Sequence, residues 1–406
     1  MKSALPALAA ALILSGCATV PAGSGAHPVM LGGKVLPTPA ERMALRDFPS
    51  IYQAWNPLDM PAQYPQDTIA QRIAAAAKHD LLWEEPVSQI GFKTPLVLGL
   101  EWDGAHAGQS TRFKSASLAQ AIKNRIELLR LNPAMVTLME IRWRDAPGSY
   151  LPEDSPWWKR NPDGTREAGW DGGPEPYYML NYENPGFIRH VGEQARIAVQ
   201  SGVYDGVMLD WSGYLPIVEE VRRSVGDDAI VIVNIHDDIE DGEKYAHLIN
   251  GAFMECDPEP GKLCGWDKMS RALRYYEAAF RSPKVNALEG WGDRKDFKRM
   301  RAVTTMGLTQ SDAFVLYADP NPLKTPDHLH DWYAFWDTKL GRPTAAGAMA
   351  PDGSWRRQFT NGTAVYNPFG NKTVSVSFDA DRTQASTGRR AKTFEVGAAD
   401  GDIFVR

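Results

Sequence analysis

Asp205-Gly-Val-Met-Leu-Asp210-Trp211 carries the clearest structural signal in the chain. Its three central residues form a short apolar run of the kind that makes a fully buried strand. The run ends on a carboxylate, and an aromatic residue follows. Packing gives little reason for an Asp at the carboxyl end of such a strand, whereas the active sites of closed β/α barrels lie at that end. The stretch therefore predicts a barrel strand with a functional carboxylate at its mouth.

A second stretch, Asn250-Gly-Ala-Phe-Met-Glu255, has the same form and also ends on a carboxylate. Two carboxylates at one barrel mouth are the minimum equipment for cleaving a glycosidic bond. We take Asp210 as the candidate nucleophile, or as the base if the reaction inverts, and Glu255 as the candidate acid/base. Retaining enzymes hold the pair about 5–5.5 Å apart and inverting enzymes about 6.5–9.5 Å apart, and the sequence leaves both open.

Strand-like and helix-like segments alternate around these two stretches. Eight βα units in succession indicate an α/β fold of the TIM (β/α)8 barrel type. A doubly wound open sheet is the alternative, but no Gly-rich phosphate loop follows the first strand. The second strand has two candidates. The predicted strands are 50–55, 81–84 or 96–101, 135–143, 205–210, 230–234, 251–255, 284–289 and 313–317.

The barrel is expected to end in a helix, and a second domain follows. Thr325 at the N-cap and Pro326 at the first helical position predict this helix, with Leu329, Tyr333 and Trp336 on its buried face. Beyond Gly341, short strands are broken by Asn-Gly and Asn-Pro turns. We therefore expect a catalytic barrel over 46–340 and a small antiparallel, β-sandwich-like domain over 341–406.

The N-terminus has the features of a processed segment. Residues 1–16 read as a signal peptide, because the apolar stretch is too short to cross a bilayer as a mature helix. Leu14-Ser15-Gly16-Cys17 resembles the lipobox of bacterial lipoproteins, which implies cleavage before Cys17 and lipidation of its thiol. Ala18 favours the outer membrane, on its periplasmic or cell-surface side; ordinary secretion is the alternative. Residues 17–45 are predicted to be a flexible tether.

The two remaining cysteines, Cys256 and Cys264, flank a loop-like segment directly after Glu255. Outside the cytosol disulfides persist, so we expect a bridge that stiffens this loop. Two separate thiols are the alternative.

Composition narrows the function. The chain has 406 residues, of which 43% are hydrophobic and 23% charged, as is ordinary for a globular protein. The net charge of -6 gives no basis for nucleic-acid binding. Thirteen Trp and 14 Tyr suit a cleft for sugar rings, although aromatic side chains mostly serve cores.

Further candidates for substrate binding lie at the predicted strand ends. Four more carboxylates follow apolar runs, and one of them could take the role of Glu255: Glu101, Glu140, Glu289 and Asp319. Aromatic residues there could stack on sugar rings: Trp55, Trp143, Trp211, Tyr214 and Trp291. Arg142 could pair with a catalytic carboxylate or contact an acidic sugar, and Asn234 and His236 could bind hydroxyls.

Metal and serine chemistry have weaker support. His328 and His330 have the spacing of a metal-binding pair, but on the predicted helix they would point about 200° apart and could not share one ion. No Gly-Xaa-Ser-Xaa-Gly elbow is present. The expected mechanism therefore needs no metal and no cofactor.

The two carboxylate-ended stretches resemble a family of bacterial, largely uncharacterised glycoside hydrolases related to α-galactosidases and α-amylases. The resemblance covers roughly 48–380 and includes Leu131-Asn-Pro133, Asn161-Pro-Asp-Gly164, Asn181-Tyr-Glu-Asn-Pro185, Phe359-Thr-Asn-Gly362 and Asn367-Pro368. It implies that Asp210, at the end of strand four, is the nucleophile. The acid/base of characterised relatives is commonly an Asp after strand six or a Glu after strand five, whereas this chain has Glu255 and Asn234 there.

Together these features predict a lipid-anchored glycoside hydrolase that cleaves a poly- or oligosaccharide, at α-linkages and with retention. A glycan-binding lipoprotein without turnover is the first alternative. A metal-dependent polysaccharide deacetylase is the second.

Overall fold

The structure is a computed structural model, which describes residues 29–55, 60–86, 96–171, 175–259, 262, 264–319 and 328–406. The predicted signal peptide, Cys17 and the predicted cap residues Thr325 and Pro326 lie outside the described residues. Among the described residues, no helix is both long enough and apolar enough to span a bilayer.

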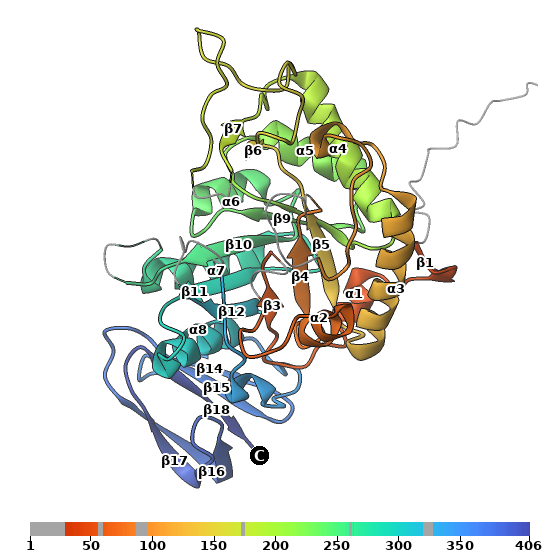
Figure 1. Cartoon of the computed structure of the whole chain (residues 1–406). Helices are drawn as coiled ribbons and strands as arrows, with labels where there is room; N and C mark the ends of the chain where they lie inside the picture. The colour runs from red at the N-terminus through yellow and green to blue at the C-terminus, as the bar shows by residue number, and fades with distance from the viewer. Residues whose placement is uncertain are drawn as a thin grey trace, which may run out of the picture.

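Eight parallel strands form the barrel, as predicted (Figure 1). The sheet closes where Ile51 bridges Val315, and the Val315 amide donates to the Ser50 carbonyl at 2.9 Å. In barrel order the strands are β3 (Tyr52–Gln53), β4 (Leu81–Glu84), β5 (Val136–Glu140), β8 (Gly206–Leu209), β9 (Ile230–Asn234), β10 (Gly251–Cys256), β11 (Ala287–Trp291) and β12 (Phe314–Ala318). Of the two candidates for the second strand, the segment 81–84 is the barrel strand.

The amino ends of the strands are held by polar residues that precede glycines. Asp205 accepts a hydrogen bond from the Thr137 amide at 2.9 Å, and Asn250 accepts one from the Val231 amide at 3.1 Å. A Cβ at Gly206 would lie 1.9 Å from the Ile230 carbonyl oxygen, so only glycine permits this strand spacing. The Asp-Gly and Asn-Gly pairs therefore fix strand pairing at the base of the barrel.

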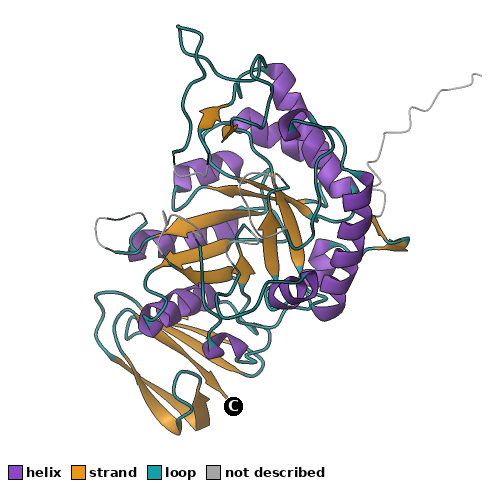
Figure 2. Ribbon diagram, viewed as in Figure 1, coloured by secondary structure: helices purple, strands orange, loops and turns teal. Residues whose placement is uncertain are grey.

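Helices cover the outside of the barrel (Figure 2). They are α2 (Ile69–Ala76), α3 (Ser115–Leu131), α4 (Pro185–Gln200), α5 (Leu215–Val225), α6 (Ile239–Tyr245), α7 (Trp266–Ala279) and α8 (Phe297–Gln310). Capping explains where several begin: Thr68 makes a capping box at α2, and Asn184 precedes Pro185 at the first position of α4. A two-stranded ribbon of β6 (Asp145–Pro147) and β7 (Tyr177–Met179) organises the long loop before α4.

The predicted final helix is wrong. Residues 328–333 have no regular secondary structure, and only a 3-10 turn, η2 (Ala334–Asp337), follows them. The backbone of this segment bonds to distant parts of the barrel: Asp319 donates its amide to the Leu329 carbonyl, and Ala62 donates to the His330 carbonyl, both at 2.9 Å. Carbonyl groups used in this way cannot serve a helix.

The predicted antiparallel domain is present at the C-terminus. Its strands pair in the order β13 (Ala348–Met349), β14 (Trp355–Gln358), β15 (Gly362–Asn367), β18 (Asp400–Val405), β16 (Val374–Gln384) and β17 (Arg390–Val396). All six strands belong to one hydrogen-bonded sheet rather than to two packed sheets. Within it, β16 pairs with β18 only at Thr383 and Gln384. The sheet lies against α8, where Arg301 binds Asp400 at 3.0 and 2.8 Å (Figure 1).

The predicted tether is wrong for its second half. Residues 29–45 form a hairpin of β1 (Met30–Leu31) and β2 (Lys34–Val35), followed by α1 (Pro39–Met43). Thr38 makes a capping box at α1, and the buried Arg42 forms an ion pair with Asp205. A buried ion pair at the base of the barrel ties this segment to the fold, which composition alone did not indicate.

Candidate active site

Carboxyl groups from five strands gather at the mouth of the barrel. Four of them are less than a tenth exposed, and Asp210, just after β8, is partly buried. The other four are Glu85 after β4, Glu140 on β5, Glu255 on β10 and Glu289 on β11. Burying this many carboxyls at one place is costly unless other groups compensate each charge.

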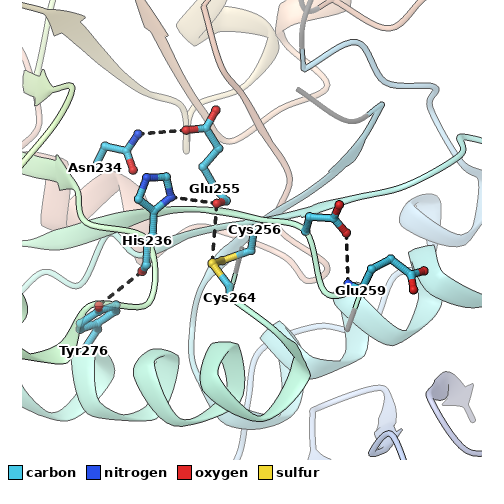
Figure 3. Close-up of a disulfide and its surroundings, with 8 residues drawn as sticks. Asn234, His236, Glu255, Cys256, Glu259, Cys264 and Tyr276 are labelled. Atoms are coloured by element: carbon cyan, nitrogen blue, oxygen red, sulfur yellow. Dashed lines mark hydrogen bonds between the residues drawn. A yellow bond between two sulfur atoms is a disulfide. The ribbon is translucent and has the colours of Figure 1, made fainter. Parts of the chain in front are cut away.

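A single amide nitrogen connects the two predicted catalytic carboxylates. Asn234 Nδ2 donates to Asp210 Oδ1 at 3.0 Å and to Glu255 Oε2 at 3.1 Å, and Figure 3 shows the second bond. The two oxygens therefore lie no more than about 6 Å apart, and close to 5 Å if the two N–H bonds diverge as in an ordinary amide, near the separation of a retaining pair. The side chain predicted to bind hydroxyls thus sets the spacing of Asp210 and Glu255.

The pKa of each member of this pair is raised. Burial is the main cause for Glu255, and the negative charges of Glu289 and Asp210 add to it, while His328 opposes it. Burial also raises the pKa of Asp210, which Arg142 and the Asn234 hydrogen bond oppose. Two carboxylates, Glu289 and Asp210, favour the protonated form of Glu255, and Arg142 is the main charge that favours the ionised form of Asp210.

Arg142 is the main cation at this mouth. It binds Glu85 through two hydrogen bonds, at 2.7 and 2.8 Å, and lies 3.3 Å from Glu140. Burial lowers the pKa of Arg142, but the two carboxylates outweigh it and the pKa is raised. Trp55 donates its indole N–H to Glu140, whose own pKa is well above its ordinary value because of burial.

His328 links two further carboxyls. Its Nδ1 lies 2.9 Å from both oxygens of Glu289, and its Nε2 lies 3.4 Å from Glu255 Oε1. The imidazole also packs on Trp55, with ring centroids 4.8 Å apart. These three residues, Glu255, Glu289 and His328, offer ligand atoms that all lie within 4.8 Å of one another and could hold a metal ion.

The sequence argument against a shared His328–His330 metal site relied on the helix that is absent. The two side chains do point to different places: His328 faces Glu289, whereas His330 Nε2 lies 3.0 Å from His79 Nε2. Burial lowers the pKa of His79 to about 4, which is consistent with a neutral imidazole pair. Only His328 belongs to the mouth.

Backbone strain is concentrated at the same place. Trp55, Trp211, His236 and His328 have φ values of 36°, 70°, 47° and 54°, although none is a glycine. Bulky residues rarely adopt this conformation, and each instance costs about 1–3 kcal/mol. Such strain is typical of functional sites, where the surrounding structure holds a side chain in a particular position.

The predicted aromatic residues surround the mouth to different depths. Trp211 is 36% exposed, and the Arg144 guanidinium lies 3.9 Å from its ring centroid. Tyr214 packs against Tyr182, with ring centroids 5.0 Å apart. Trp143 and Trp291 are buried, at 3% and 7% exposure. Trp211 is the most open of the predicted stacking platforms.

Three predicted residues have other partners. Glu101 forms an ion pair with Lys114 at 2.6 Å and is not among the five carboxylates at the barrel mouth. Asp319 binds Arg294 at 2.8 Å. His236 donates from Nδ1 to the Glu255 backbone carbonyl at 2.8 Å, which fixes the strand end that carries Glu255 (Figure 3).

The disulfide between Cys256 and Cys264 is present and closes the loop after Glu255, with Cα atoms 5.3 Å apart (Figure 3). It begins at the residue after Glu255. The bridge therefore limits the movement of the strand end that carries the predicted acid/base.

Sequence reasoning missed Glu85 and Asp145, and it set His328 aside because it expected a helix there. Glu85 was hidden because the second strand was ambiguous, and Asp145 lies in the long loop, where its charge raises the pKa of Asp210. Glu85 directly follows a predicted strand and could have been found once Leu81–Glu84 was chosen.

Solved structures with a similar fold include two α-amylases and a pullulanase. An α-amylase from Lactobacillus plantarum is 14% identical with a TM-score of 0.54, and covers 90% of this chain and 99% of its own. A noncanonic maltogenic α-amylase from Thermotoga neapolitana is 11% identical with a TM-score of 0.53, over 88% and 99%. A pullulanase from Anoxybacillus sp., complexed with maltotriose, is 10% identical with a TM-score of 0.55, over 93% and 74%.

The sequence matches no protein-family model and no curated protein. At identities this low, structural likeness shows the fold alone. The barrel implied by the sequence resemblance is therefore confirmed, whereas membership of the particular bacterial family stays a prediction.

Proposed function

We propose that this protein is a glycoside hydrolase that cleaves a poly- or oligosaccharide by a retaining mechanism. The observation that carries the proposal is the Asn234 amide, which hydrogen-bonds both Asp210 and Glu255. The contact supports the proposal because a spacing near 5 Å suits attack on one face of a sugar by one carboxylate and proton donation to the leaving group by the other.

In this mechanism Asp210 attacks the anomeric carbon, and the bond to the leaving oxygen breaks. Glu255 donates its proton to that oxygen as it leaves. The ionised Glu255 then takes a proton from water, which attacks the glycosyl–Asp210 ester and releases the sugar. The raised pKa of Glu255 supplies the proton for the first step.

The substrate class follows from the site and from the fold neighbours. The exposed Trp211 offers a face for stacking on a pyranose ring, and carboxylates accept hydrogen bonds from sugar hydroxyls. Solved structures with this fold are named as α-amylases and as a pullulanase. We therefore propose α-linked glucans and related α-linked polymers as first substrates.

We also propose that the enzyme works outside the cytosol, as an outer-membrane lipoprotein anchored through Cys17. The lipobox-like sequence supports this location, and so does the disulfide beside the site. Metabolic labelling with a fatty-acid analogue tests it: Cys17→Ser should abolish labelling, and a labelled variant would contradict the anchor.

The function is tested with purified protein, a panel of α- and β-linked polysaccharides, and proton NMR of newly formed anomers. Asp210→Asn should lower kcat by at least about 10³-fold while folding normally. Asp381→Asn, an exposed carboxylate in the C-terminal domain, is the matched control and should retain full activity.

The first anomer released should have the configuration of the substrate. Inversion would contradict the role of Asp210 as nucleophile. Unchanged activity in Asp210→Asn would contradict the site itself. Saturable binding by both proteins with no cleavage of any polymer would support the glycan-binding alternative instead.

A further inference from the structure

Glu255, Glu289 and His328 form a compact cluster that includes the proposed acid/base. Glu255 and Glu289 are paired residues on the neighbouring strands β10 and β11, so their side chains leave the sheet side by side. All three are buried, and their ligand atoms lie within 4.8 Å of one another. The proposed glycosidase mechanism uses only Glu255.

The orientation of His328 is that of a metal ligand held by a carboxylate. Nδ1 lies 2.9 Å from both oxygens of Glu289, so the proton on Nδ1 points there. A carboxylate that accepts from one imidazole nitrogen commonly fixes the other nitrogen for a metal ion. The other nitrogen, Nε2, faces Glu255 Oε1.

The distance between these two facing atoms fits a bound ion. Nε2 and Oε1 are 3.4 Å apart. Two donor atoms bound tetrahedrally at 2.0–2.2 Å from a zinc ion are themselves about 3.4 Å apart.

Tyr52 is a second, independent observation. Its side chain is 0% exposed, and its hydroxyl has no hydrogen-bond partner among the described residues. Its ring lies 6.2 Å from that of Phe253, two residues before Glu255 on β10. Burial raises the pKa of the hydroxyl, and the nearby charges of Glu289 and Glu255 raise it further. A buried hydroxyl without a partner is costly, and a water molecule on a metal ion would supply one.

We propose that the cluster of Glu255, Glu289 and His328 holds one divalent transition-metal ion of the zinc class. His328 Nε2 and Glu255 are the direct ligands, and Glu289 orients the imidazole. Mixed nitrogen and oxygen donors suit zinc better than calcium or magnesium, which prefer oxygen alone. This binding does not depend on the proposed function.

One consequence does rest on the proposed function. A metal ion and the catalytic proton compete for the same carboxylate, Glu255. Zinc should therefore inhibit the glycosidase, and a chelator should restore activity.

Binding is tested by calorimetric titration of the metal-stripped full mature protein with zinc, together with elemental analysis of the dialysed complex. The wild type should bind one equivalent. His328→Gln should weaken this binding at least 100-fold, and Glu289→Gln should weaken it about 10–100-fold. His247→Gln removes an exposed histidine that lies before the amino end of β10, the end opposite Glu255, and should bind as the wild type does.

Thermal unfolding of the metal-free proteins shows whether each variant is folded. Cobalt substitution adds an optical readout, because tetrahedral cobalt absorbs strongly in the visible range, and this band should be absent from His328→Gln. Failure of the wild type to bind a stoichiometric ion, or equal binding by His328→Gln, would overturn the proposal.

Activity separates this proposal from the glycosidase. Zinc inhibition of polysaccharide cleavage supports both. Hydrolysis that requires zinc supports the metal site, overturns the metal-free mechanism, and favours the deacetylase alternative. If no polysaccharide is cleaved, the glycosidase proposal fails while the titration still decides the metal site.

Discussion

Asn234 has a stronger effect on the site than its neutral side chain suggests. Its one nitrogen donates to both Asp210 and Glu255, so removing the donor would leave two buried carboxylates facing each other. Mutual repulsion would then raise the pKa of both and separate them. The residue therefore both positions the pair and keeps it chemically distinct.

Asn234→Asp tests this role with almost no change in shape. The added carboxylate cannot donate, and its charge should raise the pKa of Glu255 further. We expect kcat to fall about 10²–10³-fold and the alkaline limb of the kcat/KM profile to move to higher pH. An exposed asparagine, Asn161→Asp, is the control. An unchanged pH profile would contradict the proposed contact.

At the scale of the elements, β8 and β10 each have a polar residue that fixes strand pairing at the amino end and a candidate catalytic carboxylate at the carboxyl end. Asp205 and Asn250 hold the amino ends of β8 and β10, while Asp210 and Glu255 lie at the carboxyl ends. At the carboxyl end of β4, a structural carboxylate and a carboxylate of the barrel mouth occupy adjacent positions. Glu84 accepts from the Leu98 amide and the Tyr204 hydroxyl, whereas Glu85 binds Arg142.

Glu84 makes stability depend on pH. Burial raises its pKa from 4.5 to about 7. A raised pKa means that the folded state holds the proton more tightly, so this contribution is complete below pH 4.5 and is lost as pH rises through about 7.

Glu84→Gln keeps the acceptor oxygen and removes the ionisation. Urea unfolding at pH 5 and pH 8 should show the wild type losing about 1–3 kcal/mol more than the variant between the two values. Parallel losses in both proteins would show that Glu84 does not titrate in this range.

The elements also show how far sequence reasoning reaches. Apolar runs ending on carboxylates correctly predicted β8 and β10, because a buried parallel strand leaves a strong local pattern. The local sequence pattern failed to predict burial where a side chain binds a residue far away in the sequence. In α3 the apolar Ile126 is exposed, whereas its charged neighbour Arg125 is buried because it binds Asp205.

Distant partners also explain why the helix predicted at His328 was wrong. Apparent cap residues and an apolar face predicted a helix at His328. Its backbone segment is instead fixed by hydrogen bonds from the amides of Asp319 and Ala62, which the local sequence cannot reveal. The candidate nucleophile was found from one strand, whereas its surroundings needed the folded barrel.

At the scale of the whole molecule, the C-terminal sheet and the barrel meet tightly at α8. A Cβ added at Gly401 would lie 1.8 Å from Thr305 Oγ1 on that helix. The contact joins β18 to the helix that follows β11, the strand carrying Glu289. The sheet is therefore expected to support the site from outside.

Gly401→Ala should force β18 away from α8 and lower the free energy of unfolding by about 2–4 kcal/mol, measured by urea denaturation. Gly397→Ala, where an added Cβ meets nothing within 4 Å, should change it by less than about 0.5 kcal/mol. Equal free energies of unfolding for the two variants would show that β18 can move away from α8 without loss of stability.

The ion pair between Arg42 and Asp205 also has a geometric consequence. It holds the N-terminal segment against the amino ends of β5 and β8, at the opposite end of the barrel from Asp210. A protein attached to a surface through residues that precede this ion pair would have the amino ends of its barrel strands nearest the surface. The barrel mouth would then face the medium. Long or insoluble polysaccharides could then reach the carboxyl ends of the strands from the surrounding medium without first passing between the enzyme and its support.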